Sequence, residues 1–98
     1  MKIIAGRLGG RFFSSPPGRR SHPMSQKMRG ALFNALGDIE GLSVLDAFAG
    51  SGALGIEALS RGAASVVAVE RDKLAHRTLA ENFTRLGLIE NVKAVRAN

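Results

Sequence analysis

The chain has 98 residues, no cysteine and a net charge of +6. Its length allows one small domain at most, and the lack of cysteine excludes disulfides and thiolate metal sites. His22 and His76 lie too far apart to predict a metal site, and no apolar run is long enough to span a membrane. We therefore expect a cytoplasmic protein that binds neither a metal nor a membrane.

The excess positive charge lies entirely at the start of the chain. Residues 1–37 contain seven basic residues and no acid, whereas residues 38–98 contain seven bases and eight acids. This asymmetry is typical of a nucleic-acid-facing segment on a neutral body, although a solvated basic terminus has the same composition. We predict a basic arm over residues 1–24, with candidate phosphate contacts at Arg7, Arg11, Arg19 and Arg20.

The arm is predicted to begin with a β-hairpin and to continue as an extended loop. Residues 2–5 and 11–14 have strand-like patterns and flank a glycine-rich stretch that is typical of a turn. A helix is expected from Ser25, as its N-cap, to Leu36. Helical spacing gives this helix an apolar face made of Met28, Leu32, Ala35 and Leu36.

The rest of the chain alternates strands and helices. Strands are predicted over residues 42–45, 65–70 and 91–96, and helices over 52–61 and 73–86. This order predicts an α/β fold with parallel strands joined by right-handed crossovers. The continuous apolar run of the first strand predicts burial on both of its faces.

The last helix has a regular apolar pattern and recognisable ends. Asp72 is suited to cap its start, Gly87 is suited to end it, and Glu81 and Arg85 are spaced as an exposed ion pair. The stripe predicted to face the core consists of Ala75, Leu79, Phe83 and Leu86.

A glycine-rich turn joins the first parallel strand to its helix. The strand ends at Asp46, and Gly50 and Gly52 lack a Cβ where the bend is tight and a ligand must touch backbone. Gly55 would let the helix pack closely on the strand. Glu70 ends the second strand, where a carboxylate suits the paired hydroxyls of a ribose. The pattern is typical of the start of a nucleotide-binding unit.

The glycine spacing also fits a dinucleotide fingerprint, so the glycines alone do not identify the cofactor. The charged residues near the turn distinguish the two cofactors. Between Asp46 and Ser60 there are two acids and no lysine or arginine. S-adenosylmethionine carries a sulfonium and an ammonium, whereas a dinucleotide places an anionic pyrophosphate at this turn. Coulomb attraction therefore favours S-adenosylmethionine and a methyltransferase over an NAD-dependent oxidoreductase.

Several longer stretches add a more specific signal. They are residues 3–6 (IIAG), 15–18 (SPPG), 29–34 (RGALFN) and above all 46–62 (DAFAGSGALGIEALSRG). With these stretches, the whole chain resembles the N-terminal half of the RsmD family, the bacterial guanine-N2 methyltransferases of 16S, or small-subunit, ribosomal RNA.

The resemblance implies a Rossmann-like S-adenosylmethionine-dependent methyltransferase fold, with a parallel sheet that is truncated here and preceded by the hairpin and first helix. It implies that residues 25–98 are the first half of this domain, and that the arm faces RNA of the small ribosomal subunit. The cofactor contacts implied are Asp46, Phe48, Gly50 and Gly52 along the methionine portion, Glu70 at the ribose and Asn98 near the adenine, and Ala49 and Ser51 of the same turn are also expected to bind the cofactor.

The family's Asp/Asn-Pro-Pro-Tyr/Phe motif, which holds the target amine after the fourth strand, is absent because no proline follows Pro23. Without that strand, residues 42–46 would form an exposed apolar edge. We therefore expect a truncated chain, or a second copy that covers the edge, with no catalytic residue and no methyl transfer by the chain alone. The alternative is an RNA-binding module with a vestigial cofactor turn.

Overall fold

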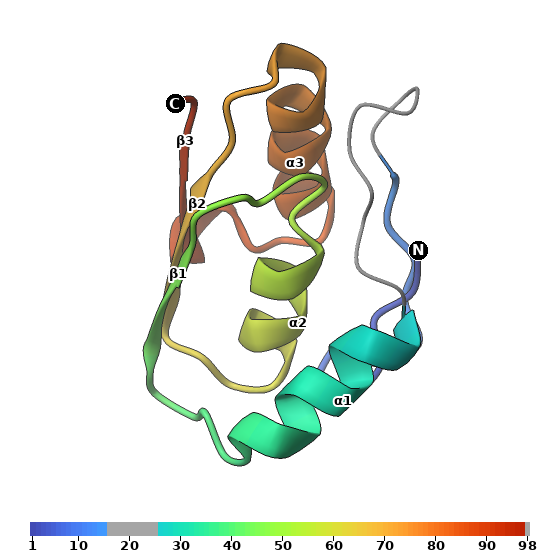
Figure 1. The fold of residues 1–98 in the computed structure, drawn as a ribbon. Coiled ribbons are helices and arrows are strands. Elements are labelled where there is room, and N and C mark those ends of the chain that lie inside the picture. Colours follow the sequence, from blue (N-terminus) through green and yellow to red (C-terminus); the bar gives the residue numbers. More distant parts are fainter. Residues whose placement is uncertain (16–25, 98) are drawn as a thin grey trace.

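The computed structural model describes residues 1–15 and 26–97 of the protein, so the expected N-cap Ser25 lies outside the described residues. The described part forms a parallel α/β unit preceded by the arm and one helix, as Figure 1 shows. Its elements are α1 Gln26–Leu36, β1 Ser43–Asp46, α2 Ala53–Ser60, β2 Ser65–Val69, α3 Lys73–Arg85, the 3-10 helix η1 Ile89–Asn91 and β3 Val92–Val95.

The described strands form one parallel sheet in the order β1-β2-β3, which makes β1 and β3 its two edges. Val44 pairs with Val66, and Val66 pairs with Val92. Helices α2 and α3 lie on the same face of this sheet (Figure 1). The predicted β-α-β-α-β order is therefore confirmed.

The described helices leave the other face of the sheet bare. Val66 and Ala68 are 1% and 0% exposed, whereas Val67 between them is 37% exposed and its partner Leu45 is 69% exposed. Side chains alternate between the two faces of a strand, so Val67 and Leu45 belong to the bare face. The prediction that the first strand is buried on both faces is wrong, because within residues 1–15 and 26–97 only one face has a helical layer.

Helix α3 has the predicted ends and the predicted stripe. The Asp72 carboxylate accepts a hydrogen bond from the Ala75 N–H at 2.9 Å, and Gly87 follows the helix with a φ of +75°. The predicted pairing of Glu81 with Arg85 is wrong, since Glu81 lies 4.0 Å from Arg77 and Arg85 donates to the arm instead. All four stripe residues are buried: Ala75, Leu79, Phe83 and Leu86.

Helix α2 lies close to β2, as the glycine in its first turn predicts. A Cβ on Gly55 would lie 2.9 Å from Val66 Cγ1 and 3.2 Å from the Phe83 ring. A larger residue would therefore push α2 away from the sheet.

Helix α1 packs through a face that differs from the predicted one. Met28 and Leu36 are 61% and 56% exposed, whereas Arg29 and Phe33 are buried. The Arg29 guanidinium donates to the Lys2 carbonyl and lies over the Phe13 ring of the arm. A local apolar pattern misplaces this face because a buried arginine, with partners distant in sequence, takes the inward position.

The hairpin of the arm is shorter than predicted but is firmly attached to the body. Lys2 and Phe12 form a single antiparallel bridge. At the turn, the Arg7 N–H donates to the Ser60 carbonyl at 2.7 Å, and the Leu8 N–H donates to Ser60 Oγ at 2.9 Å. The turn of the arm is therefore held at the end of α2.

Glu57 is the polar centre of the contact between the arm, α1 and α2. It is 0% exposed, and its two oxygens accept the N–H groups of Ile4 at 2.9 Å and Ala5 at 3.0 Å. Arg61 Nε donates to Oε2 at 2.8 Å, and Arg29 Nε lies 3.6 Å from Oε1. Two guanidinium groups thus compensate a fully buried carboxylate, which would otherwise be very costly to bury.

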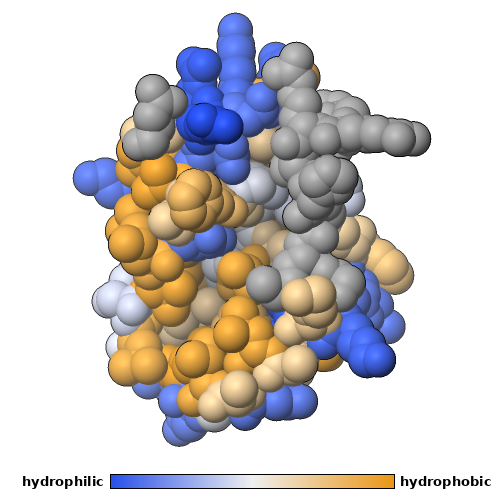
Figure 2. All heavy atoms as spheres, viewed as in Figure 1, coloured by the Kyte–Doolittle hydropathy of each residue, from blue (hydrophilic) through white to orange (hydrophobic). Residues whose placement is uncertain are grey.

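Apolar side chains also gather on one side of the surface. Figure 2 shows them around β1 and towards α1. A hollow of about 200 Å³ lies between these two elements. The exposed residues that contribute to this surface are Leu32, Leu36, Leu42 and Leu45.

Candidate cofactor site

The candidate site lies at the carboxyl ends of β1 and β2, where open α/β sheets commonly bind ligands. Asp46 is the last residue of β1, and Glu70 directly follows β2. The turn between β1 and α2 is fixed to the end of β2 because the Ala49 N–H donates to the Val69 carbonyl at 3.0 Å. The fold therefore brings the two acids and the glycine-rich turn together.

Asp46 is buried and only partly satisfied. The residue is 8% exposed, and its Oδ2 atom is shielded from solvent with no hydrogen-bond partner among the described residues. Burial raises the pKa of the Asp46 carboxyl above its ordinary value of 3.8, while a hydrogen bond from the Phe48 backbone lowers the pKa and the nearby Glu70 charge raises it. A buried acceptor of this kind fits a cationic hydrogen-bond donor.

Glu70 helps to shape the turn itself. Its Oε1 accepts the Gly50 N–H at 2.8 Å, and its Oε2 accepts the Asp72 N–H at 2.8 Å. A carboxylate offers about four acceptor positions, so each oxygen still has capacity for a ligand hydroxyl. The sequence predicted the position of this acid but not its bonds to the protein backbone.

The two turn glycines have different surroundings. Gly50 has a φ of +57°, and a Cβ there would meet no atom of the described residues within 4 Å. Gly52 has a φ of +90°, and a Cβ there would lie 2.8 Å from the Phe83 ring. The open space is therefore beside Gly50, and Gly52 is needed for packing under the turn.

The other predicted contacts in the turn, Phe48, Ala49 and Ser51, differ in how exposed they are. Phe48 is 92% exposed at the edge of the site, whereas Ala49 and Ser51 are buried. Ser51 Oγ lies 3.6 Å from the sulfur of Met1, so its side chain faces the arm. Ala49 and Ser51 could therefore contact a ligand only through their backbone.

The charge argument from the sequence needs one correction. Glu57, the second acid between Asp46 and Ser60, is neutralised under the arm by Arg29 and Arg61. The acid that accompanies Asp46 in the site is Glu70, which comes from the next strand. The site still combines two carboxylates with a helix start whose cap residue, Gly52, has no side chain to cover it.

Asn82 is a supporting residue that the sequence reasoning did not identify. It is 0% exposed, and its amide donates to the Ser51 carbonyl at 3.0 Å and to the Ser14 carbonyl at 2.9 Å. Its Oδ1 accepts the Ser14 N–H at 3.0 Å. One side chain thus joins α3, the glycine-rich turn and the arm. A polar residue beside the apolar stripe of α3 is the signal that could have identified it.

Two of the four predicted RNA contacts can be located. Arg7 and Arg11 are both exposed; Arg7 lies within the hairpin turn and Arg11 directly follows it. Arg19, Arg20 and the predicted adenine contact Asn98 lie outside the described residues.

In the described ranges, no helix is both long and apolar enough to cross a membrane. Nor do these ranges contain a group of three or more potential metal ligands among histidine, aspartate and glutamate side chains.

Comparisons with known proteins agree with this geometry. The family model described as "Conserved hypothetical protein 95" matches residues 1–98. Ribosomal RNA small subunit methyltransferase D of Escherichia coli K12 is 38% identical over 99 residues, which cover 100% of this chain and 50% of that protein. The protein of the same name from Buchnera aphidicola subsp. Acyrthosiphon pisum is 41% identical over 97 residues, covering 98% and 50%.

A solved structure shows the same fold. An Escherichia coli protein assigned as a methyltransferase matches with a TM-score of 0.89 and 37% identity, covering 100% of this chain and 52% of that one. The chain spans about half the length of the curated relatives it matches. It therefore has a Rossmann-like methyltransferase fold with a truncated sheet.

Proposed function

The chain belongs to the RsmD family, and from this premise we propose that it is the cofactor-binding half of a ribosomal RNA methyltransferase. The methyl donor is S-adenosylmethionine, and the acceptor is a guanine N2 amine of small-subunit ribosomal RNA. Such a substrate also places the protein in the cytoplasm. The observation that carries the proposal is the buried Oδ2 of Asp46, which has no hydrogen-bond partner among the described residues and lies beside an open glycine turn.

Each group of the site has a role in this proposal. Asp46 would accept a hydrogen bond from the ammonium of the cofactor's methionine portion and would stabilise its positive charge. The backbone around Gly50 would hold the methionine portion, and Glu70 would use its remaining acceptor positions for the ribose hydroxyls. The cofactor supplies an activated methyl group on a sulfonium. Pyrophosphate would be repelled by the two carboxylates, which argues against NAD.

The proposal is tested by calorimetric titration with S-adenosylmethionine, with NAD as the control ligand and Asp46→Ala as the control protein. We expect saturable binding of S-adenosylmethionine alone, and loss of that binding in the variant. Absence of binding by a chain that circular dichroism shows to be folded would contradict the proposal.

A second candidate is an RNA-binding module with a vestigial cofactor turn. Glu70 favours it, because both of its oxygens already accept protein N–H groups. The two functions differ in one measurement: a module of this kind would bind RNA but give no heat with S-adenosylmethionine.

We also propose that the 98-residue chain does not transfer methyl groups alone. Transfer to an exocyclic amine needs the amine held in line with the sulfonium methyl, and the sequence lacks the Asp/Asn-Pro-Pro-Tyr/Phe motif that does this in the RsmD family. Turnover on small ribosomal subunits by this chain would contradict the proposal.

A further inference from the structure

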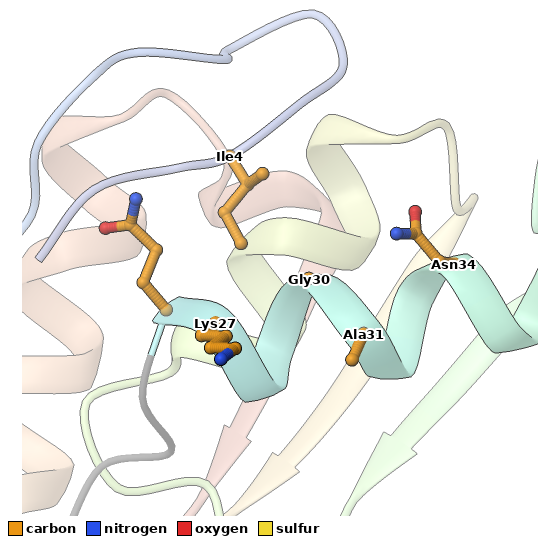
Figure 3. Close-up of a pocket in the computed structure, with 6 residues that line it drawn as sticks. Ile4, Lys27, Gly30, Ala31 and Asn34 are labelled. Atoms are coloured by element: carbon orange, nitrogen blue, oxygen red, sulfur yellow. The ribbon is translucent and has the colours of Figure 1, made fainter.

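A groove of about 480 Å³ lies between Ile4 of the arm and α1, away from the candidate cofactor site. Figure 3 shows Ile4 pointing from the arm towards Gly30, with Lys27, Ala31 and Asn34 along the helix. The groove is lined by Ile4, Gln26, Lys27, Gly30, Ala31 and Asn34. None of these residues belongs to the site around Asp46.

The polar side chains of the groove are free to bind a ligand. Gln26, Lys27 and Asn34 are all exposed, and none has a side-chain hydrogen bond or ion pair with another described residue. Together they offer one ammonium and two amide groups, all of which donate hydrogen bonds. No acid lines the groove, and residues 1–37 contain none. The nearby Glu57 is fully buried and is paired with Arg29 and Arg61.

Gly30 keeps the floor of the groove low without being needed for packing. A Cβ at this position would lie 3.5 Å from Ile4 Cδ1, which is an ordinary contact, and the φ of Gly30 is not positive. A glycine inside a helix destabilises it by roughly 0.5–1 kcal/mol relative to alanine. The fold itself would therefore tolerate a methyl group here, and the open floor calls for another explanation.

We propose that this groove binds the RNA backbone, with one phosphate paired to Lys27 and with Gln26 and Asn34 donating to phosphate or ribose oxygens. The proposal rests on the proposed function, because it takes RNA as the macromolecule that this protein binds. Cationic and N–H donors without a competing carboxylate match the anionic oxygens of a phosphodiester. The groove would thus position RNA without reading its sequence.

The first test measures how salt affects RNA binding by a Lys27→Gln variant. A fluorescein-labelled stem-loop RNA is titrated with each protein by fluorescence anisotropy between low and high salt. Losing one phosphate contact should lower the slope of log affinity against log salt by about 0.7–0.9. The affinity at 0.1 M salt should fall roughly five- to eightfold, and the difference should vanish near 1 M. Lys93→Gln, on the edge strand β3, is the matched control and should bind like the unchanged protein.

The second test separates binding from folding. Gly30→Ala should raise the melting temperature, because it removes a helix-interior glycine, and should weaken RNA binding, because its methyl group fills the floor. If Gly30 has a purely structural role, Gly30→Ala should raise the melting temperature and leave the RNA affinity unchanged. That result would contradict the proposal that the groove binds RNA. Unchanged affinity of Lys27→Gln would overturn it as well.

The two proposals fail in different ways. If the unchanged protein binds the stem-loop and both variants bind it equally well, the proposal that the groove binds RNA is wrong, while the proposal that the arm binds RNA is unaffected. If the unchanged protein binds no RNA, the proposal for the groove and the proposal of an RNA substrate are both wrong. Titration with S-adenosylmethionine reports on the cofactor site independently of either result.

Discussion

The Asp46 carboxyl influences stability and ligand binding in opposite directions. It is buried, one of its oxygens has no partner among the described residues, and its pKa is raised above 3.8 chiefly by desolvation. The folded protein therefore binds the Asp46 proton more readily than the unfolded chain does. By linkage, Asp46 lowers stability as the pH rises from its unfolded pKa through its folded pKa. Retaining such a group makes physical sense only if its charge has another use.

Asp46→Asn should therefore raise the melting temperature at neutral pH while weakening S-adenosylmethionine binding. Loss of one charge-assisted hydrogen bond is worth about 1.5–3 kcal/mol, or roughly ten- to hundredfold in affinity. In the unchanged protein, affinity should fall as the pH drops through the raised pKa of Asp46, because the carboxyl becomes neutral. Scanning calorimetry and titrations across this pH range measure both effects. Asp38→Asn, at an exposed loop position, is the control, and a variant that melts lower and binds normally would contradict the argument.

For single residues of the site, the sequence predicts which ones lie close together but not which contacts each of them makes. Asp46 and Glu70 come together because they lie at the ends of neighbouring parallel strands, and Gly50 joins them because it lies in the turn that follows β1, which is a consequence of topology. That Glu57 faces the arm instead follows from Arg29 and Arg61 reaching it from two helices. The Glu57–Arg61 pair has a local i,i+4 spacing, whereas the contact with Arg29 depends on the packed structure and leaves no local pattern in the sequence.

Among the elements, the arm and the cofactor turn are joined through α3. Asn82 holds both Ser14 of the arm and Ser51 of the turn, and it is fully buried. A displacement of the arm therefore changes the support of the turn. Because coupling between two binding sites is reciprocal, a ligand that orders the turn should also order the arm.

Asn82→Ala should destabilise the protein by at least about 2 kcal/mol, since backbone groups of Ser14 and Ser51 lose their partners. In the folded variant, the Ser14 amide should exchange its hydrogen faster, and S-adenosylmethionine should bind more weakly. Cofactor should slow Ser14 exchange in the unchanged protein only. Hydrogen exchange and titration measure these effects. Asn91→Ala is the control, because Asn91 is exposed and, among the described residues, its side chain donates only to the Ala64 carbonyl, at 3.3 Å. Unchanged cofactor affinity in folded Asn82→Ala would exclude the link.

The helices differ in how well the sequence predicts their inward faces. In α3 the buried stripe is apolar, so periodicity alone finds it. In α1 the inward positions are Arg29 and Phe33, and the arginine is inward because Glu57, Phe13 and the Lys2 carbonyl surround it. An apolar pattern then marks the outward face of α1, where Leu32 and Leu36 are exposed.

For the molecule as a whole, the exposed Leu32 and Leu36 of α1 form one apolar surface with the unpaired edge of the sheet. Leu32 and Leu36 line the same hollow as Leu45 of β1, whose outer edge has no neighbouring strand among the described residues. An apolar edge strand with unpaired backbone groups is prone to pair with another chain. The expectation of a strand buried on both faces assumed a sheet with helices on both sides, and the described sheet has them on one.

We therefore expect the 98-residue chain to self-associate through this edge, and Leu45→Lys to make it monomeric. Leu45 is already 69% exposed, so the substitution should change the free energy of unfolding by only about 0.5 kcal/mol or less. A lysine on an edge strand opposes pairing, because its charge would have to be buried against the neighbouring chain. Sedimentation velocity over a range of protein concentrations measures the association. Ile89→Lys, at a 47% exposed apolar residue in η1, is the control and should still associate. A monomeric unchanged chain, or equal association of both variants, would show that the edge is not the contact.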